Sequence, residues 1–263
     1  MFTNSMGETR TTTASPRRRT AYVLAFAGLC AALVAAIAIP SAGARDVKVL
    51  GRTKHTPRPA CPNLDHPTRC KAIGRVTGFM TVADGRKHPF RVKEDGKLVA
   101  WALDVSKPAN TKKNPQRNSF GGLFKNKEFG EKPTARIAVI KHKGGVSYKL
   151  LRQSPTVALG GVLGQKEVFT LKKPLAVRKG NIVAFTSPTW TPDFAQRHLE
   201  PSENKWRASR RKNNCGPKDN SDEAKVRFAR KSHAHQNKGS ERDYECLYTH
   251  GRILYWAYIV PNK

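Results

Sequence analysis

The residues with the clearest chemical potential form a cationic run, Trp206–Lys212, in which one aromatic residue stands among four cations. Guanidinium groups bind phosphate, sulfate or carboxylate through paired hydrogen bonds, and a neighbouring indole can stack on a flat ligand. The ordinary alternative in a strongly basic chain is a solvated charge run. We take Trp206, Arg207, Arg210 and Arg211 as candidate ligand-binding residues.

Trp190 and Phe194 form a second candidate surface. Pro188 and Pro192 flank Trp190 at the predicted end of a strand, so the two rings are expected to stand as a platform at the edge of a sheet. Flat aromatic faces stack on sugar rings and on bases. The alternative is that Trp190 closes the end of the core, because large aromatic residues are mostly buried.

Signals for catalysis are weak. Glycoside hydrolysis needs two carboxylates across a cleft, and Asp104, Glu167 and Asp193 are the acids nearest the ends of predicted strands, but nothing in the sequence brings any two together. The nucleophile elbow G-x-S-x-G is missing, because Lys149 stands where its second glycine would follow Gly145. We predict no catalytic residue and favour a protein that is not an enzyme.

Metal-binding patterns are also incomplete. His233 and His235 would share one side of a strand but have no third ligand nearby in the sequence, and Asp219, Asp222 and Glu223 lack the spacing of a calcium loop. We therefore predict neither a metal nor a cofactor.

Four cysteines follow the apolar N-terminal run, and an even number of cysteines in an exported protein indicates disulfides. Proximity in the chain predicts that Cys61 pairs with Cys70 and Cys215 with Cys246. Zinc is the alternative, with His66 between the first two cysteines, but the C-x(2–4)-C spacing of structural zinc sites is absent.

The elements that must position these residues are short apolar runs rich in Val, Ile and aromatic residues, separated by Gly, Pro, Asp and Lys, which is typical of strands joined by turns. Alternation places Trp101 in the core, and the last run, apolar on both faces, is expected in the middle of a sheet. The predicted strands are 75–82, 88–92, 97–105, 135–141, 147–151, 156–159, 167–171, 182–186 and 252–260.

Two polar segments border these strands. Residues 45–60 are basic and rich in Pro and Thr, which predicts an extended tether before a domain over 61–263. Residues 196–243 form a long insertion before the last strand, and its part from 205 to 242 holds twelve Lys or Arg against four Asp or Glu. Irregular loops of this length are uncommon and usually functional or disordered.

The phrase Lys173–Ala184, with its strand, Lys-Gly-Asn turn and second strand, resembles jelly-roll and lectin-like sandwiches, and the domain is similar in style to secreted bacterial proteins of that kind. The resemblance implies an architecture and no activity. We expect an all-β protein, an antiparallel β-sandwich of jelly-roll type with a disulfide-tethered basic insertion.

Residues 1–44 predict export. Three arginines, Arg17–Arg19, precede an apolar run, Thr20–Ile39, and a small-residue site that ends at Ala44, the order found in secretory signal peptides. The alternative is an uncleaved membrane anchor, because a run of about 20 apolar residues can span a bilayer. If the segment is cleaved, no stable transmembrane domain remains. In both cases the rest of the chain lies outside the cytoplasm.

Charge indicates the class of partner. The chain carries 49 Lys and Arg against 19 Asp and Glu, a formal +30, and 45 against 18 remain after Ala44. Such a charge attracts anions. We therefore expect a secreted or envelope-associated binding protein for an anionic polysaccharide or other polyanion, such as a teichoic-type polymer or extracellular nucleic acid. The alternatives are an enzyme acting on acidic polysaccharide and a structural envelope protein.

Overall fold

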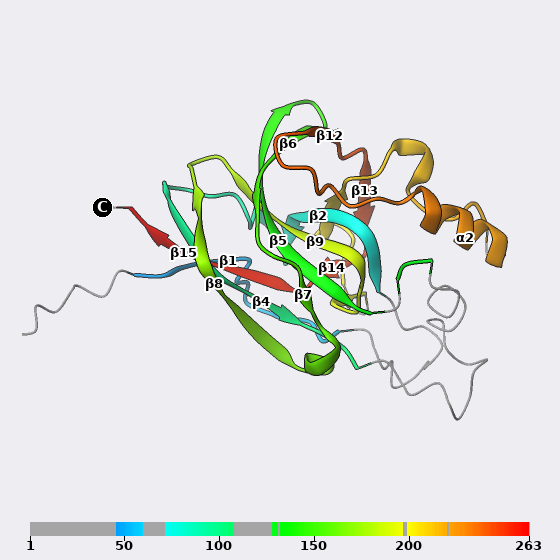
Figure 1. The fold of residues 1–263 in the computed structure, drawn as a ribbon, viewed down its shortest axis with the longest axis horizontal. Helices are drawn as coiled ribbons and strands as arrows, with labels where there is room; N and C mark the ends of the chain where they lie inside the picture. The colour runs from blue at the N-terminus through cyan, green and yellow to red at the C-terminus, as the bar shows by residue number, and fades with distance from the viewer. Residues whose placement is uncertain are drawn as a thin grey trace, which may run out of the picture. The chain divides into compact units, whose positions relative to one another are not determined.

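Antiparallel strands make up about half of the described residues, as the alternating apolar runs predict. The computed structural model describes residues 46–59, 72–107, 128–130, 132–196, 199–219 and 221–262. All of them belong to one unit that spans residues 44–263. Figure 1 shows their two main sheets.

The smaller main sheet has the order β1 (Lys48–Leu50), β15 (Tyr255–Pro261), β4 (Gly96–Asp104) and β8 (Lys166–Val177). Every neighbouring pair in it is antiparallel. The last strand of the chain, β15, therefore has a hydrogen-bonded strand on each side, which confirms its predicted central position.

The larger sheet carries the remaining long strands and the strands of the insertion. Its order is β12 (Glu241–Asp243), β6 (Ser147–Gln153), β5 (Thr134–Gly144), β9 (Ile182–Thr191), β2 (Ile73–Ala83), β11 (Lys205–Ala208) and β13 (Cys246–Thr249). Two short strands pair beside this path, β3 (Arg86–Lys87) with β2 and β7 (Val157–Ala158) with β5. A separate ribbon joins β10 (Phe194–Ala195) to β14 (Arg252–Ile253).

The core lies between the two main sheets. Trp101 is fully buried and stacks on Phe169 with ring centroids 4.6 Å apart, which confirms its predicted core position. Tyr255 of the smaller sheet donates its hydroxyl proton to the carbonyl of Val183 in the larger sheet, over 3.0 Å. This arrangement confirms the all-β class and agrees with a sandwich.

Two segments differ from the sequence prediction. Residues 48–50, within the predicted tether, pair with β15, and the buried guanidinium of Arg252 donates to the carbonyl of His55 and to Oγ1 of Thr53, so this segment is docked on the sheets. Residues 88–92 are not a strand, because His88 has a φ of 51° and the chain turns there. Only an isolated bridge joins Arg91 to β9.

The insertion is partly helical. After β11 it forms the turn η4 (Lys212–Asn214) and the helix α2 (Asp222–Lys231), whose first turn is capped by the Ser221 hydroxyl accepting from the Ala224 N–H (Figure 1). The disulfide Cys215–Cys246 is present, as predicted, and joins the end of η4 to β13. Cys61 and Cys70 lie outside the described residues. No helix in the described part of the chain is long and apolar enough to cross a membrane.

Candidate functional site

The predicted aromatic platform is wrong, because its rings are buried. Trp190 and Phe194 are each 9 % exposed and Trp206 is 3 % exposed. Trp206 stacks on Tyr248 with centroids 4.3 Å apart, and the ring of Phe194 lies so close to Gly251 that a Cβ there would meet it at 2.1 Å. These rings pack the protein and present no open face to a ligand.

The physical reason lies in strand β9, which continues to Thr191 instead of ending before Pro188. Its partner β2 shifts register here, so that Pro188 and Thr189 together face Arg75 between the regular pairs. Bulges are where a sheet tolerates proline, because no ladder N–H is required there. The strand therefore carries Trp190 into a small buried cluster with Phe129 and with Ala229 of α2, apart from the main core.

Two of the three candidate arginines have structural roles. Arg207 donates from Nη1 to the carbonyl of Tyr244 over 2.7 Å. Arg210, 7 % exposed, donates to the Tyr248 hydroxyl over 2.9 Å and to the carbonyl of Gly74 over 2.8 Å. Their donors serve the fold, so among these arginines the exposed Arg211 is the one suited to a ligand.

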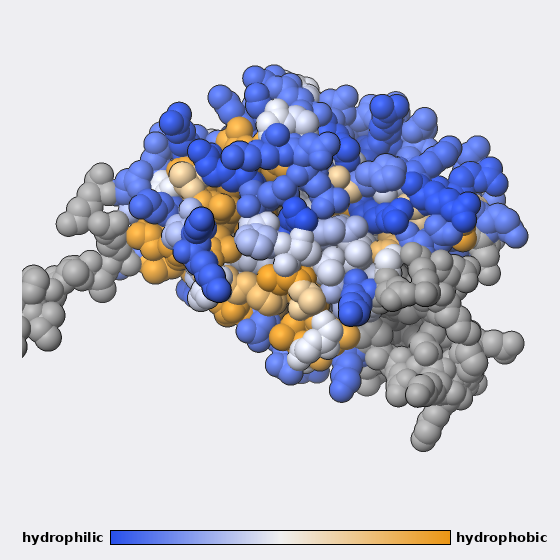
Figure 2. Space-filling view, viewed as in Figure 1, coloured by the Kyte–Doolittle hydropathy of each residue, from blue (hydrophilic) through white to orange (hydrophobic). Residues whose placement is uncertain are grey.

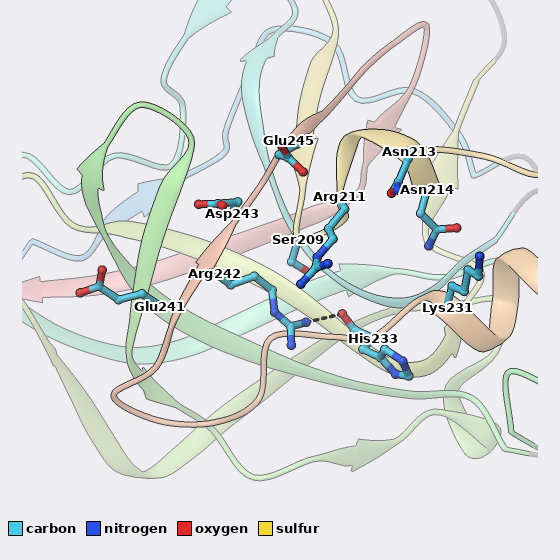
Figure 3. Close-up of a pocket in the computed structure, with 10 residues that line it drawn as sticks. All are labelled: Ser209, Arg211, Asn213, Asn214, Lys231, His233, Glu241, Arg242, Asp243 and Glu245. Atoms are coloured by element: carbon cyan, nitrogen blue, oxygen red, sulfur yellow. Dashed lines mark hydrogen bonds between the residues drawn. The ribbon is translucent and has the colours of Figure 1, made fainter.

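Arg211 lines an open cleft of about 810 Å³ between η4, the end of α2 and β12 (Figure 3). Its walls are made of polar and charged side chains. The lining residues are Ser209, Arg211, Asn213, Asn214, Lys231, His233, Glu241, Arg242, Asp243 and Glu245. Most of this set escaped the sequence analysis, since the insertion gives no local signal that β12 pairs with β6.

Three restraints hold the cleft together. The Cys215–Cys246 disulfide fixes the end of η4 to β13. At the start of η4 the backbone N–H of Lys212 donates to Oε2 of Glu245 over 2.8 Å. Arg242 donates from Nη1 to the carbonyl of His233 over 2.6 Å, which fastens the segment after α2 to β12. The disulfide and these two hydrogen bonds thus fix the backbone segments that carry the cationic side chains.

The charges of the cleft do not neutralise one another. Arg211, Lys231 and Arg242 line it together with Glu241, Asp243 and Glu245. Within the described residues none of these cations forms a salt bridge with any of these acids. Glu241 instead pairs with Lys143 at 3.7 Å, outside the lining.

A buried polar chain lies beside the cleft. His235 is 1 % exposed and its Nδ1 lies 3.2 Å from the Tyr244 hydroxyl, while its Nε2 lies 2.9 Å from Oγ of Ser240. Burial, with a smaller effect from Arg242, lowers the pKa of His235 to about 4. The imidazole is therefore neutral near pH 7.

These contacts do not make Ser240 a nucleophile. Its hydroxyl donates to the carbonyl of Asn237 over 2.6 Å, and Nε2 of His235 also lies 3.2 Å from the carbonyl of Ser240, so Nε2 carries the ring proton and donates toward Ser240. The N–H of Ser240 donates to the carbonyl of Asn237, and the N–H of Gly239 donates to the carbonyl of Leu150. Neither backbone donor is free to stabilise an oxyanion, which acyl transfer requires. We assign a structural role to the hydrogen bonds among His235, Tyr244 and Ser240: they hold the segment after α2 on the sheet.

Tyr148, Tyr244 and His235 lie near Arg207, and their convergence in one open groove would favour an enzyme acting on acidic polysaccharide. The rings of Tyr148 and Tyr244 lie 5.0 Å apart, but Tyr244 is fully buried and Tyr148 is 7 % exposed. Burial also raises the pKa of both hydroxyls. They form a packed cluster and not a groove open to a substrate.

No two of the three candidate carboxylates, Asp104, Glu167 and Asp193, face each other. Leu103 faces Glu167 across the β4–β8 ladder, and Asp104 is the next residue of β4, so the two acids lie on opposite faces of the sheet. Asp193 is fully buried, and burial raises its pKa well above the ordinary value. The structure brings no two of these acids across a cleft.

The histidine pair also separates. His233 lines the cleft, whereas both ring nitrogens of the buried His235 have protein partners. In the described residues no three His, Cys, Asp or Glu side chains lie together as metal ligands would.

Comparison with protein-family models, curated proteins and solved structures finds no match to this chain.

Proposed function

We propose that the protein is an exported, non-catalytic binding protein for anionic polymers, and that the cleft formed by η4, α2 and β12 is its contact site. The observation that carries the proposal is the set of cations in that cleft, Arg211, Lys231 and Arg242. None of them has a salt-bridge partner within the described residues. Guanidinium groups of this kind bind phosphate, sulfate and carboxylate groups.

The charge distribution elsewhere supports an anionic partner. The chain carries a formal charge of +30, which attracts anionic partners. Figure 2 shows strongly hydrophilic side chains over the part of the molecule that carries α2 and β12.

Export is part of the proposal. It is supported by the order of arginines, apolar run and small residues over 1–44. The Cys215–Cys246 disulfide is consistent with it, because disulfides persist in oxidising compartments outside the cytoplasm.

We further propose that the sandwich is a jelly roll. Its support is the strand order, with β1, β2, β4, β5, β6, β8, β9 and β15 taken as the eight main strands. The smaller sheet then has the order first, eighth, third, sixth, and the larger sheet has second, seventh, fourth, fifth. Two interleaved Greek keys give this order. The insertion adds β11 beside the second strand and β12 beside the fifth, and β13, which follows the insertion, pairs with β11.

The experiment measures binding to heparin and to single-stranded DNA over a range of salt concentrations. We compare the R211A/K231A variant with a matched control, K172A/K173A, which removes two exposed cations from β8 on the other main sheet. Both variants lose the same formal charge. Arg242 is left intact because it also braces the loop of His233.

The cleft variant is expected to bind more weakly and to flatten the salt dependence. On single-stranded DNA each lost phosphate contact lowers the log–log slope by about 0.7, so two lost contacts lower it by roughly 1.4. The control should keep nearly the parental slope. Equal effects of the two variants would leave diffuse charge as the cause, and no binding to either polymer would refute the proposed function.

A further inference from the structure

We propose that the outer face of the smaller sheet, formed by β1, β15, β4 and β8, docks on the surface of a lipid bilayer with anionic headgroups. This face points away from the core and combines apolar side chains with lysines. It is a different surface from the cleft, so the inference goes beyond the proposed function.

Alternation along the strands gives the smaller sheet two distinct faces. Trp101, Leu103 and Tyr255 belong to the main core. Their neighbours in sequence, Ala102 and Trp256, belong to a separate apolar cluster, because successive side chains of a strand point to opposite faces. The outer face of this sheet is therefore apolar as well.

The strand register arranges the outward side chains in rows across the sheet. One row holds Val49, Tyr258, Ala100 and Thr170. A second row holds Trp256, Ala102 and Val168. All of these residues except Thr170 are apolar or aromatic, whereas outward-facing residues of sandwich strands are usually polar.

Part of this outer face is open to solvent. Val168 is 47 % exposed, and Val47, two residues before Val49, is 49 % exposed. They are two of the three large apolar side chains that are exposed in the described part of the chain. Val49 and Tyr258 are half-buried. Continuous exposed apolar patches with a polar rim mark sites that contact proteins or membranes.

The charges on this sheet have one sign. In its four strands every exposed charged side chain is a lysine, and these are Lys48, Lys97, Lys166, Lys172 and Lys173. Nζ of Lys166 lies 4.2 Å from the centre of the Trp256 ring, which places a cation on the apolar face itself. Lysine can lay its aliphatic stem on apolar surface while its ammonium group stays in a polar layer.

This combination fits the boundary of an anionic bilayer. Apolar side chains enter the region between headgroups and acyl chains, and the ammonium groups meet the anionic headgroups. A second copy of the chain fits less well, because face-to-face contact would bring two sets of lysines together on chains that each carry a formal +30.

The place of this face in the molecule suits an exported protein. Its edge strand β1 is the first described strand after the apolar run 20–39 and the predicted cleavage site at Ala44. Figure 1 shows β1, β8 and β15 toward one end of the molecule and α2 at the other, so docking would leave the cleft beside α2 accessible. Figure 2 shows hydrophobic surface next to hydrophilic side chains at the end that carries β8 and β15.

The test measures binding to vesicles by cosedimentation. One set of vesicles contains phosphatidylcholine alone, and the other contains equal amounts of phosphatidylcholine and the anionic phosphatidylglycerol. The protein is used from Arg45 onward, because this part contains the compact unit with all described residues and lacks the apolar run 20–39, which would itself enter a bilayer. Heparin binding is measured as a separate readout.

Two pairs of variants separate the face from diffuse charge. V168S removes an exposed apolar side chain from the face, and its control L247S removes one of similar exposure, 49 %, from β13 of the larger sheet. K97Q/K166Q removes two cations of the face, and its control K141Q/K218Q removes two exposed cations from β5 and from the insertion. All the substituted side chains are exposed, and the unfolding midpoint of each variant checks that it is folded.

The parent is expected to bind the anionic vesicles and to bind phosphatidylcholine vesicles much more weakly. V168S should lower the partition coefficient on anionic vesicles by about 4-fold, the effect of roughly one CH₂ group leaving apolar contact. Each lysine near an anionic leaflet contributes a factor of about 5, so K97Q/K166Q should lower the coefficient by roughly 25-fold. L247S should keep the parental value, and K141Q/K218Q should lose much less than K97Q/K166Q.

Three results would overturn the inference. Equal effects of V168S and L247S, or of the two lysine pairs, would leave diffuse charge as the cause of vesicle binding. Failure of the parent to bind either kind of vesicle would exclude the bilayer as the partner. A parental dimer in analytical ultracentrifugation that V168S weakens and L247S does not would assign the face to a second copy.

Heparin binding distinguishes this inference from the proposed function. Val168 lies outside the cleft, so V168S should bind heparin as the parent does. A protein that binds heparin but neither kind of vesicle refutes the membrane surface alone. A protein that binds anionic vesicles through this face but does not bind heparin or single-stranded DNA refutes the proposed function and leaves this inference standing.

Discussion

The buried carboxyl group of Asp193 should make the stability of this protein fall as pH rises. The residue lies at the corner between β9 and β10, where its backbone carbonyl accepts from the N–H of Leu254 over 2.8 Å. Its side chain is fully buried, and neither oxygen has a hydrogen-bond partner within the described residues. A charged carboxylate is costly in such a place, so burial raises its pKa well above the ordinary value.

The sign follows from proton linkage. In the unfolded chain an aspartate loses its proton near pH 4, whereas in the folded protein Asp193 keeps it to a higher pH. Between these two pKa values the folded state binds one more proton than the unfolded state. Stability therefore decreases by about 1.4 kcal/mol for each pH unit in that interval, and below the unfolded pKa the group contributes no pH dependence.

The perturbation is Asp193→Asn, which keeps the shape and the backbone hydrogen bond but does not titrate. Unfolding free energies of parent and variant are measured by denaturant titration from pH 5 to pH 7. The stability of the variant relative to the parent should rise with pH, by at most about 2.7 kcal/mol over these two units. Taking this difference cancels titration of other groups, and the exposed Glu94→Gln serves as control.

The refuting result is a difference between parent and D193N that does not change with pH. It would mean that Asp193 is ionised in the folded protein and has its charge compensated. A slope of the same size in Glu94→Gln would remove Asp193 from the explanation.

Three further predictions concern stability. Replacing Cys215 and Cys246 together by Ala should cost about 3 to 4 kcal/mol in the chain-entropy model, because the bridge spans 31 residues; an unchanged denaturation midpoint would contradict this. Trp101→Ala should cost about 3 to 5 kcal/mol in the same assay, since the side chain is fully buried, and a cost below 1 kcal/mol would argue against that packing. Because the folded pKa of His235 is lowered to about 4, the parent should lose stability as pH falls from about 6.5 towards 4. The His235→Gln variant should lack this loss. If its free energy of unfolding falls with pH in parallel with that of the parent, the prediction is refuted.

Local sequence pattern was sufficient for the class of fold. The alternation around Trp101 predicted a strand with one face in the core, and the doubly apolar run 252–260 predicted a central strand, although the chain breaks it into β14 and β15. Both inferences hold because the side-chain period of a strand is a local property. The Cys215–Cys246 pairing was also predictable, since the two cysteines follow one another in the order of cysteines along the chain, 31 residues apart.

Local pattern failed where long-range pairing decides exposure. Prolines around Trp190 indicate the end of a strand, but a bulge opposite Arg75 lets β9 continue and carries the ring inside. Arg207 and Arg210 likewise appear as free cations in the sequence. Only the fold shows the carbonyls of Tyr244 and Gly74 that accept from them.

The sequence by itself determined that this is a β-rich, strongly basic chain with a leader-like N-terminus and one disulfide-tethered insertion. Tertiary structure alone decided which of the many cations share a site. Arg211, Lys231 and Arg242 come from a loop, a helix end and a strand, and they meet because β12 pairs with β6 and the disulfide draws η4 onto β13. Residue types and local periods specify which segments form strands, whereas a site of this kind depends on contacts between segments that are distant in the chain.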